Sequence, residues 1–307
     1  MDTNIKVSVI VPSYKRGPKL VKRALQSLLS QTYTAIEIIL VDDNAKFEHR
    51  EYRTQLQSLI NELADNRIRY IENNENLGGA LSRNVGIEVA NGEYITFLDD
   101  DDLYRPNKIE RQLLFMVENK IDMSFTDLAI YNEQNELIDY REYKDIPSFE
   151  QTYLLHYHLT KQITGTPTFM CKRSILLKIN GFDDVKMGQE YYLMMKLIQS
   201  HSQIGYLPES DVVAYRYNIE AISTGPVKIS GERALYQYKK SFFSILKTSE
   251  KRYIRCRHYA VMAVAYKRNR KFLQAFGQLV VSVCCAPVVA AKEALGLFKR
   301  RRKNRGK

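Results

Sequence analysis

A short apolar segment that ends in four consecutive aspartates constrains this chain more than any other stretch. Residues 94–98 read YITFL and are followed directly by residues 99–102, DDDD. The apolar run predicts a buried strand of a parallel sheet. Two like charges about 4 Å apart cost roughly 4 kcal/mol at an effective dielectric constant of about 20, so the carboxylates need compensation. A divalent cation with a bound phosphate would supply it, and carboxylate oxygens suit Mg²⁺ or Mn²⁺. The competing interpretation is a solvated acidic turn before a helix near Pro106.

Strands and helices alternate along the first hundred residues. Short β-branched runs predict strands at 7–11, 36–41 and 68–71, and helical spacing predicts helices after Gly17, at 48–63 and at 80–90. Such alternation is typical of a doubly wound α/β sheet, in which the carboxyl ends of the strands share one edge. The turns after Val11, Val41 and Leu98 should therefore converge on one crevice. The chain has no glycine-rich dinucleotide fingerprint after its first strand and no P-loop motif, which argues against both kinds of site.

Five motifs in this region resemble those of a known enzyme family. They are VSVIVPSY at 7–14, EIILVDD at 37–43, NLG at 76–78, RNVGI at 83–87 and GEYITFLDDDD at 92–102. In this order and spacing they resemble the motifs of inverting family 2 glycosyltransferases, over about residues 5–220. The resemblance implies an α/β chain with the A-type glycosyltransferase fold, a Rossmann-like and mostly parallel sheet with helices on both faces. A basic helical C-terminal extension would follow it.

The resemblance also implies a nucleotide site. Asp43 resembles the residue that faces the imide N–H of uracil, and Asp42 is the less favoured of this pair. Pro12 and Tyr14 would wall the base and ribose, although ordinary packing at a strand end is an alternative. Arg83 would meet the diphosphate, unless it is only a surface arginine.

A metal site is implied by the D-x-D pair Asp99 and Asp101. By similarity Asp101 binds Mn²⁺ or Mg²⁺, while Asp99 or Asp100 holds ribose or a metal-bound water. The metal would neutralise the charge that grows on the departing nucleoside diphosphate.

The acceptor side is expected in the second half. A strand is predicted at 165–170, and a Gly-Phe-Asp turn at 181–183 precedes a helix that begins near Gly188. Many family members carry Glu-Asp or Gln-Asp at the start of this helix, whereas this chain has Gln189-Glu190. Glu190 matches the general base, and the helix dipole would favour its ionised form. The alternative is that Glu190 only complements that dipole.

The C-terminal region has a different charge from the rest. Residues 231–307 hold 20 Lys and Arg against 3 Asp and Glu, a net charge of +17, whereas residues 1–230 carry −6. The apolar stretch at 279–291 is shorter than the roughly 20 residues that span a bilayer. Together with the cationic end it suggests a surface anchor on anionic lipid, and a small helical bundle is the alternative. Nucleic-acid binding is not expected, because no recognisable reading module is present.

These observations lead to one combined prediction. Residues 1–225 form a glycosyltransferase domain, with a nucleotide-binding half at 1–102 and an acceptor half at 103–225, and residues 226–307 form the basic region. The enzyme would transfer a single sugar from a nucleotide-sugar, with uridine as the favoured base, to a glycan or lipid-linked acceptor in capsule or other surface-polysaccharide synthesis. Because the N-terminus lacks an apolar signal region, we expect a cytoplasmic protein that is peripheral at the inner membrane face. A sugar nucleotidyltransferase and a non-catalytic, membrane-docked glycan-binding protein are the alternatives.

Overall fold

The computed structural model describes residues 5–45, 48–217 and 226–291, which form two compact units. The first unit takes most of the chain up to residue 216. The second takes the C-terminal region together with residues 156–162 and 186–188. The domain boundary predicted at residue 225 lies outside the described residues, and the subdivision at residue 102 stays a prediction.

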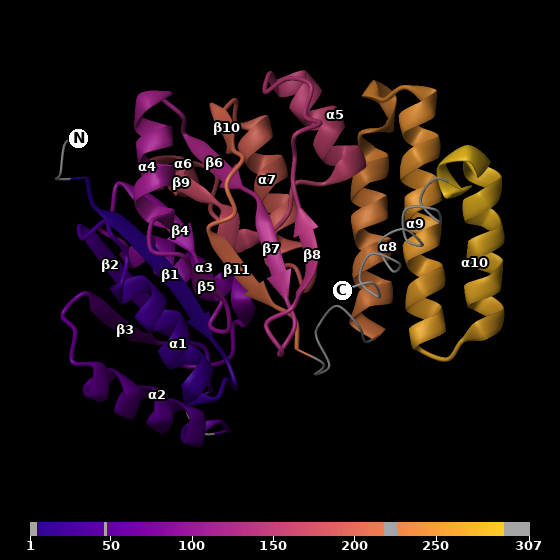
Figure 1. Cartoon of the computed structure of the whole chain (residues 1–307). Helices are drawn as coiled ribbons and strands as arrows, with labels where there is room; N and C mark the ends of the chain where they lie inside the picture. Colours follow the sequence, from indigo (N-terminus) through magenta and orange to yellow (C-terminus); the bar gives the residue numbers. More distant parts are fainter. Residues whose placement is uncertain (1–4, 46–47, 218–225, 292–307) are drawn as a thin grey trace. The chain divides into compact units, whose positions relative to one another are not determined.

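The first unit is built on a seven-stranded sheet with the order β10-β6-β9-β4-β1-β2-β3 (Figure 1). Its strands are β1 Val7–Ser13, β2 Ile36–Asp42, β3 Ile68–Glu72, β4 Tyr94–Phe97, β6 Met123–Thr126, β9 Met170–Lys172 and β10 Ile204–Leu207. All neighbours pair in parallel except β9, which runs antiparallel to β4 and β6. The mostly parallel α/β sheet expected from the sequence is thus confirmed. The strand expected at 165–170 is instead a 3₁₀ turn, Thr166–Thr168, followed by β9.

Helices cover both faces of this sheet. The covering helices are α1 Pro18–Leu29, α2 Arg50–Leu63, α3 Gly78–Val89, α4 Lys108–Glu118, α6 Arg173–Lys178 and α7 Gln189–Gln199. A further helix, α5 Gln151–Lys161, is divided between the two units. Side chains alternate across a strand, so Val9 and Ile10 of β1 face opposite sides. Val9 belongs to the core cluster that includes α1, α2 and α4. Ile10 faces α3 at Gly86, where an added Cβ would lie 2.5 Å from the Ile10 Cγ2 atom. The glycine therefore lets α3 approach the sheet closely.

A second, four-stranded sheet was not expected from the sequence. Its order is β5-β11-β7-β8, with β5 Leu103–Tyr104, β11 Val212–Tyr215, β7 Leu128–Tyr131 and β8 Leu137–Arg141. β5 directly follows the four aspartates, and the Asp102 carboxylate accepts a hydrogen bond of 2.9 Å from the Tyr215 backbone N–H of β11. This sheet therefore fixes the end of the acidic turn.

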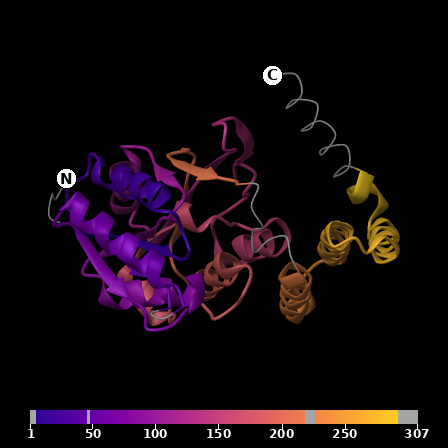
Figure 2. The same ribbon diagram turned by 90° about the horizontal axis from the view of Figure 1, so that it is seen from below.

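The second unit contains three long helices, α8 Pro226–Ser241, α9 Thr248–Arg268 and α10 Phe272–Cys285. They lie side by side with α9 in the middle, as both views show (Figure 2). The helical character of the C-terminal extension is thus confirmed. Within the described part of the chain, no helix is both long and apolar enough to cross a membrane.

Candidate nucleotide and acceptor site

Three strand ends meet at the carboxyl edge of the large sheet, as the sequence predicts. Ser13, the last residue of β1, pairs in register with Asp42, the last residue of β2. The Asp43 backbone N–H then donates to the Ser13 carbonyl at 2.9 Å. The Ser13 hydroxyl donates to the Asp100 carboxylate beyond β4 at 2.7 Å. The turns after β1, β2 and β4 therefore form one hydrogen-bonded rim.

Each aspartate of the acidic turn has a partner. Arg16 bridges two of them: its Nε lies 2.9 Å from Asp100 Oδ1 and its Nη2 lies 2.9 Å from Asp101 Oδ2. Asp99 forms an ion pair with Arg83 of α3. Asp102 is held by the backbone of β11. The interpretation of this stretch as a fully solvated turn is wrong for Asp100 and Asp102, which are each only 5% exposed.

The arginines do not fully compensate the acidic turn. Burial raises the pKa of Asp101 to about 7, and the neighbouring Asp100 carboxylate adds to the rise while Arg16 opposes it. Burial also raises the pKa of Asp100, against Arg16 and the Ser13 hydroxyl. Across the described residues, no three His, Cys, Asp or Glu side chains gather into a metal site. The oxygen ligands nevertheless fit Mg²⁺ or Mn²⁺, because Mg²⁺ is usually held by one or two carboxylates plus substrate phosphates.

Asp42 and Asp43 occupy different environments. Asp42 is fully buried, and its carboxylate accepts hydrogen bonds from Tyr70 and Asn44 and pairs with Arg53 at 3.3 Å. Asp42 therefore belongs to the interior and offers no exposed edge to a base.

Asp43 follows the end of β2 and is also buried, at 2% exposed. It accepts four hydrogen bonds of 2.8–2.9 Å, from the Asn73 and Asn76 side chains and the Leu77 and Gly78 backbone N–H groups. Asp43 thus organises the loop before α3. Its contact with a base stays a prediction, and it requires that one of these four hydrogen bonds be replaced by a bond from the base.

Tyr14 lies in an open loop beside β1 and is 40% exposed. Its hydroxyl and His49 Nε2 are 3.2 Å apart, and the two rings meet edge to face. The preceding Pro12 is partly exposed. Lys15 has a φ of 50°, a left-handed conformation, and its backbone N–H donates to Asn44 Oδ1 at 2.8 Å. The loop is thus fixed while the ring remains accessible, which suits the predicted position of Tyr14 against the base and ribose.

Arg83 is not a surface arginine, because it is only 7% exposed. Its Nη2 pairs with Asp99, and its Nη1 donates to Gln189 Oε1 and to the Gly79 carbonyl, both at 3.0 Å. Its buried Nε has no hydrogen-bond partner. Arg83 therefore joins the acidic turn to the first turn of α7.

Glu190 follows Gln189 in the first turn of α7 and is partly exposed. Among the described residues its carboxylate makes no hydrogen bond or ion pair. The rest of α7 is anchored, since Tyr191, Leu193 and Met194 are at most 1% exposed. A free carboxylate on a fixed helix start can accept a proton, which suits the predicted base.

Comparisons with known proteins decide the family. The family model described as glycosyl transferase family 2 matches residues 8–179, which is more than half of the chain. The chain belongs to glycosyl transferase family 2. It is therefore a glycosyltransferase, and neither the nucleotidyltransferase nor the non-catalytic alternative is retained.

Individual relatives agree with this assignment. An uncharacterised glycosyltransferase of Rickettsia felis is 42% identical over 134 residues, which are 44% of this chain but only 21% of the relative's length. WcaA of Escherichia coli K12, named as a colanic acid biosynthesis glycosyl transferase, is 29% identical over 79% of this chain and 84% of its own length. A crystal structure of Staphylococcus aureus TarS residues 1–349 with UDP-GlcNAc matches with a TM-score of 0.60 and 17% identity, over 95% of this chain and 92% of the other. This likeness confirms the A-type fold.

Sequence reasoning missed one residue of the glycosyltransferase's acidic rim. Arg16 bridges Asp100 and Asp101 from the loop after β1. Arg16 is a cation two positions beyond Tyr14, in a turn that was expected to converge with the turn carrying the four aspartates. Opposite charge across converging turns could have identified this pair.

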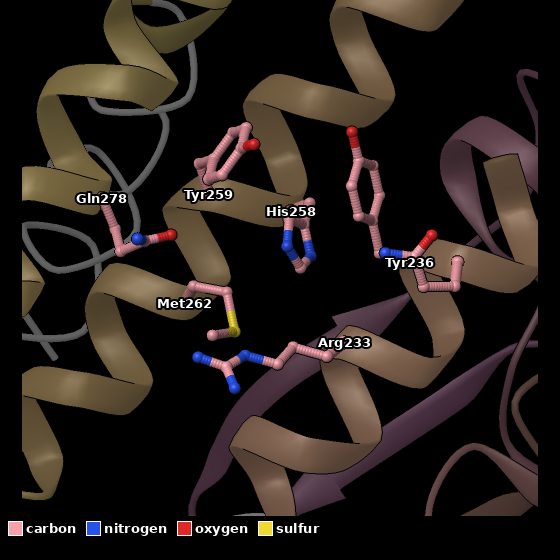
Figure 3. A pocket seen from close by; sticks show the side chains of 7 residues that line it. Arg233, Tyr236, His258, Tyr259, Met262 and Gln278 are labelled. Atoms are coloured by element: carbon pink, nitrogen blue, oxygen red, sulfur yellow. The ribbon is translucent and has the colours of Figure 1, made fainter.

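The glycosyltransferase has a separate cavity inside its second unit (Figure 3). Its volume is about 280 Å³, and its lining residues are Arg233, Tyr236, Gln237, His258, Tyr259, Met262 and Gln278. The Tyr236 and His258 rings stack at 4.0 Å, and His258 Nδ1 lies 3.2 Å from Glu232. None of the site residues predicted from the sequence lies in this cavity.

Proposed function

We propose that this glycosyltransferase moves one sugar, with inversion, from a UDP-sugar to a hydroxyl group of a glycan or lipid-linked acceptor. One observation carries the proposal: Arg83 holds Asp99 of the acidic turn and Gln189, the neighbour of Glu190, at the same time. A donor site at the strand ends and a proton acceptor on α7 are therefore parts of one site. Capsule or other surface-polysaccharide synthesis is the proposed setting, in keeping with the name of the relative WcaA.

The donor side uses the rim of the large sheet. Tyr14 and Pro12 would lie against the base and ribose, and Asp43 would accept from the base imide. Arg83 would meet the diphosphate beside the acidic turn, where its guanidinium pairs with Asp99. The uridine assignment is supported by the shared fold of TarS, which was solved with UDP-GlcNAc.

Asp99 and Asp101 would hold Mn²⁺ or Mg²⁺, and Asp100 would orient ribose or a metal-bound water. When bound, the cation neutralises the developing charge of the leaving diphosphate. Arg16 already pairs with Asp101, so this guanidinium has to share or release the carboxylate. Asp42 is left out of the proposed site, because it is fully buried.

Glu190 would act on the acceptor. Its carboxylate takes the proton of the acceptor hydroxyl as the oxygen attacks the anomeric carbon, and the bond from that carbon to the diphosphate breaks. Attack from the face opposite the departing diphosphate inverts the anomeric configuration. Glu190 is suited to this step because it is partly exposed and makes no bond to another described residue.

The acceptor also suggests where the enzyme works. A lipid-linked acceptor would be reached at the inner face of the cell membrane, and the basic C-terminal region would attract its anionic surface. Nucleic acid has no part in this proposal.

A thermal-shift screen of nucleoside diphosphates and UDP-sugars tests the proposal. A ligand that binds the folded state raises the melting temperature by mass action, so a UDP-sugar should raise it with Mn²⁺ and lose much of that effect after chelation by EDTA. Release of UDP from the stabilising donor should depend on Glu190, with Asp184→Asn, in an exposed turn, as the control. Equal stabilisation by all nucleotides, or stabilisation independent of metal, would contradict the proposed donor site.

A further inference from the structure

Helix α10 presents an apolar face to the surface of the second unit. Its most exposed large apolar side chains are Phe272, Leu273, Phe276, Leu279, Val280 and Val283, with exposures from 43% to 90%. At 3.6 residues per turn these six positions fall within about 120° of one helix face. We name this set the apolar stripe. Contiguous apolar surface of this kind marks an interaction site, whereas single exposed apolar side chains are ordinary.

The orientation of α10 is fixed by its opposite side. Ser282 is 1% exposed, and its hydroxyl donates to the Cys256 carbonyl of α9 at 2.8 Å. Such a bond ties α10 to its neighbour through the face away from the stripe. The two views show α9 between α8 and α10, so among the described residues of this unit one side of α10 remains uncovered (Figure 2).

Cations border the apolar stripe. Lys267, Arg268, Arg270 and Lys271 surround the turn between α9 and α10, and all four are exposed. No acidic residue lies between Lys251 and the end of α10. The sequence after residue 291 adds eight more Lys and Arg against one Glu. An apolar face edged by cations is the pattern of helices that lie in the plane of an anionic membrane.

We propose that α10 lies on an anionic phospholipid bilayer, with the apolar stripe among the upper acyl chains and the cations of the α9–α10 turn at the headgroups. Its 14 residues are about 21 Å long, too short to span but suitable for an in-plane helix. The inference deepens the proposed function, on which it rests for the lipid-linked acceptor.

Charge selects this partner over the other candidates. A second copy would bring two strongly cationic regions together and cost repulsion. A nucleic acid would satisfy the cations but would leave Phe272, Leu273 and Phe276 in water. Only the lipid surface satisfies both the charge and the apolar side chains.

Flotation of the full chain with vesicles tests the proposal. Wild type should bind vesicles of phosphatidylcholine with phosphatidylglycerol, and binding should weaken with added salt. Leu273→Gln with Phe276→Gln should lower the partition coefficient at least about tenfold, because two large apolar groups leave the bilayer. Val281→Gln is the matched control: Val281 is exposed but lies about 140° from the centre of the stripe, so binding should persist.

Two further measurements separate the alternatives. Arg270→Glu with Lys271→Glu should weaken binding to anionic vesicles, with less effect on vesicles of phosphatidylcholine alone. Light scattering should show the same mass for wild type and the Leu273→Gln, Phe276→Gln variant. Undiminished flotation of that variant overturns the proposal. A dimeric wild type together with a monomeric Leu273→Gln, Phe276→Gln variant overturns it as well. UDP release without vesicles should survive in this variant, so failure of the lipid surface and failure of the donor site are distinguishable.

Discussion

The Arg83 guanidinium donates a 3.0 Å hydrogen bond to the Gln189 side chain, although the two residues are 106 positions apart. Arg83 also pairs with Asp99, so one buried side chain spans the end of β4 and the start of α7. The guanidinium carbon of Arg83 also lies over the Phe182 ring, 5.6 Å from the ring centre. Because Glu190 follows Gln189 in the chain, its position depends on what Arg83 holds.

Replacing Gln189 tests this link. Gln189→Leu removes the acceptor of the Arg83 bond, and we expect kcat for UDP release to fall about tenfold with a smaller change in KM, because misplacement of a base affects the reacting geometry. Gln189→Glu retains an acceptor and should recover most of the rate. Steady-state kinetics on both variants provide the measurement. If both variants show the same loss, with unchanged melting temperatures, the positioning role is wrong.

Substitutions of Glu190 and Asp101 should impair different functions, namely turnover alone for Glu190 and both turnover and metal-dependent donor binding for Asp101. Glu190→Gln keeps the size of the side chain but cannot accept the proton, so UDP release coupled to transfer should fall roughly 10²–10⁴-fold. Stabilisation by the donor and Mn²⁺ should persist in this variant. Asp101→Asn should lose both the turnover and the metal-dependent stabilisation. Thermal shift and UDP release, measured in parallel, check the pair. Full turnover in Glu190→Gln would require another base.

The parallel core was predictable because its signals are local. The runs before Pro12 and Asp42 and the YITF segment at 94–97 each contain the apolar pattern of a buried strand. The convergence of their ends then follows from parallel pairing alone.

The small sheet was not predictable in the same way. Its strands have two to five residues, too few to show a period. Its pairings join β11 to β5 and β7, so they depend on tertiary structure. Similarly, Asp43 follows β2 at the rim, but the four hydrogen bonds that its carboxylate accepts from the loop before α3 could not be predicted from sequence spacing. Arg83 was expected at the diphosphate, but its ion pair with Asp99 was not predicted, because such a pair depends on which turns meet.

Asp43 should matter for stability as well as for any contact with a base. An amide has only one acceptor oxygen, so Asp43→Asn would leave some of the donors from Asn73 to Gly78 without an acceptor and bring its own NH₂ close to them. The cost should be about 2–4 kcal/mol, because buried donors without acceptors are expensive. Urea denaturation measures it. Asp184→Asn, in an exposed turn, is the control and should change stability by less than about 0.5 kcal/mol. A stability of Asp43→Asn equal to wild type would mean that the loop is held by other contacts.

Lys108 is a buried lysine whose replacement should stabilise the protein. It is 1% exposed, its Nζ donates to Thr96 Oγ1 at 2.6 Å, and the same Nζ lies 4.0 Å from the centre of the Tyr104 ring. These contacts contribute roughly 1 and 2 kcal/mol. Removing an ammonium ion from water costs several kcal/mol, which exceeds the stabilisation that these two contacts provide. Lys108→Met has a similar shape and no charge, so we expect a gain of about 1 kcal/mol near pH 7.

The pH dependence identifies the cause of that gain. Burial lowers the pKa of Lys108 well below its ordinary value of 10.5, and Asp211 opposes the shift only partly. Above pH 10.5 the amine is neutral in both states and carries no penalty. As the pH falls from 10.5 through the lowered pKa, the unfolded chain takes up the proton first, so wild type loses stability relative to Lys108→Met. Urea midpoints of both proteins should therefore converge as the pH rises toward 10.5. Lys19→Met, at an exposed position of α1, should show no such convergence. A constant difference between wild type and Lys108→Met would assign the gain to packing and not to charge burial.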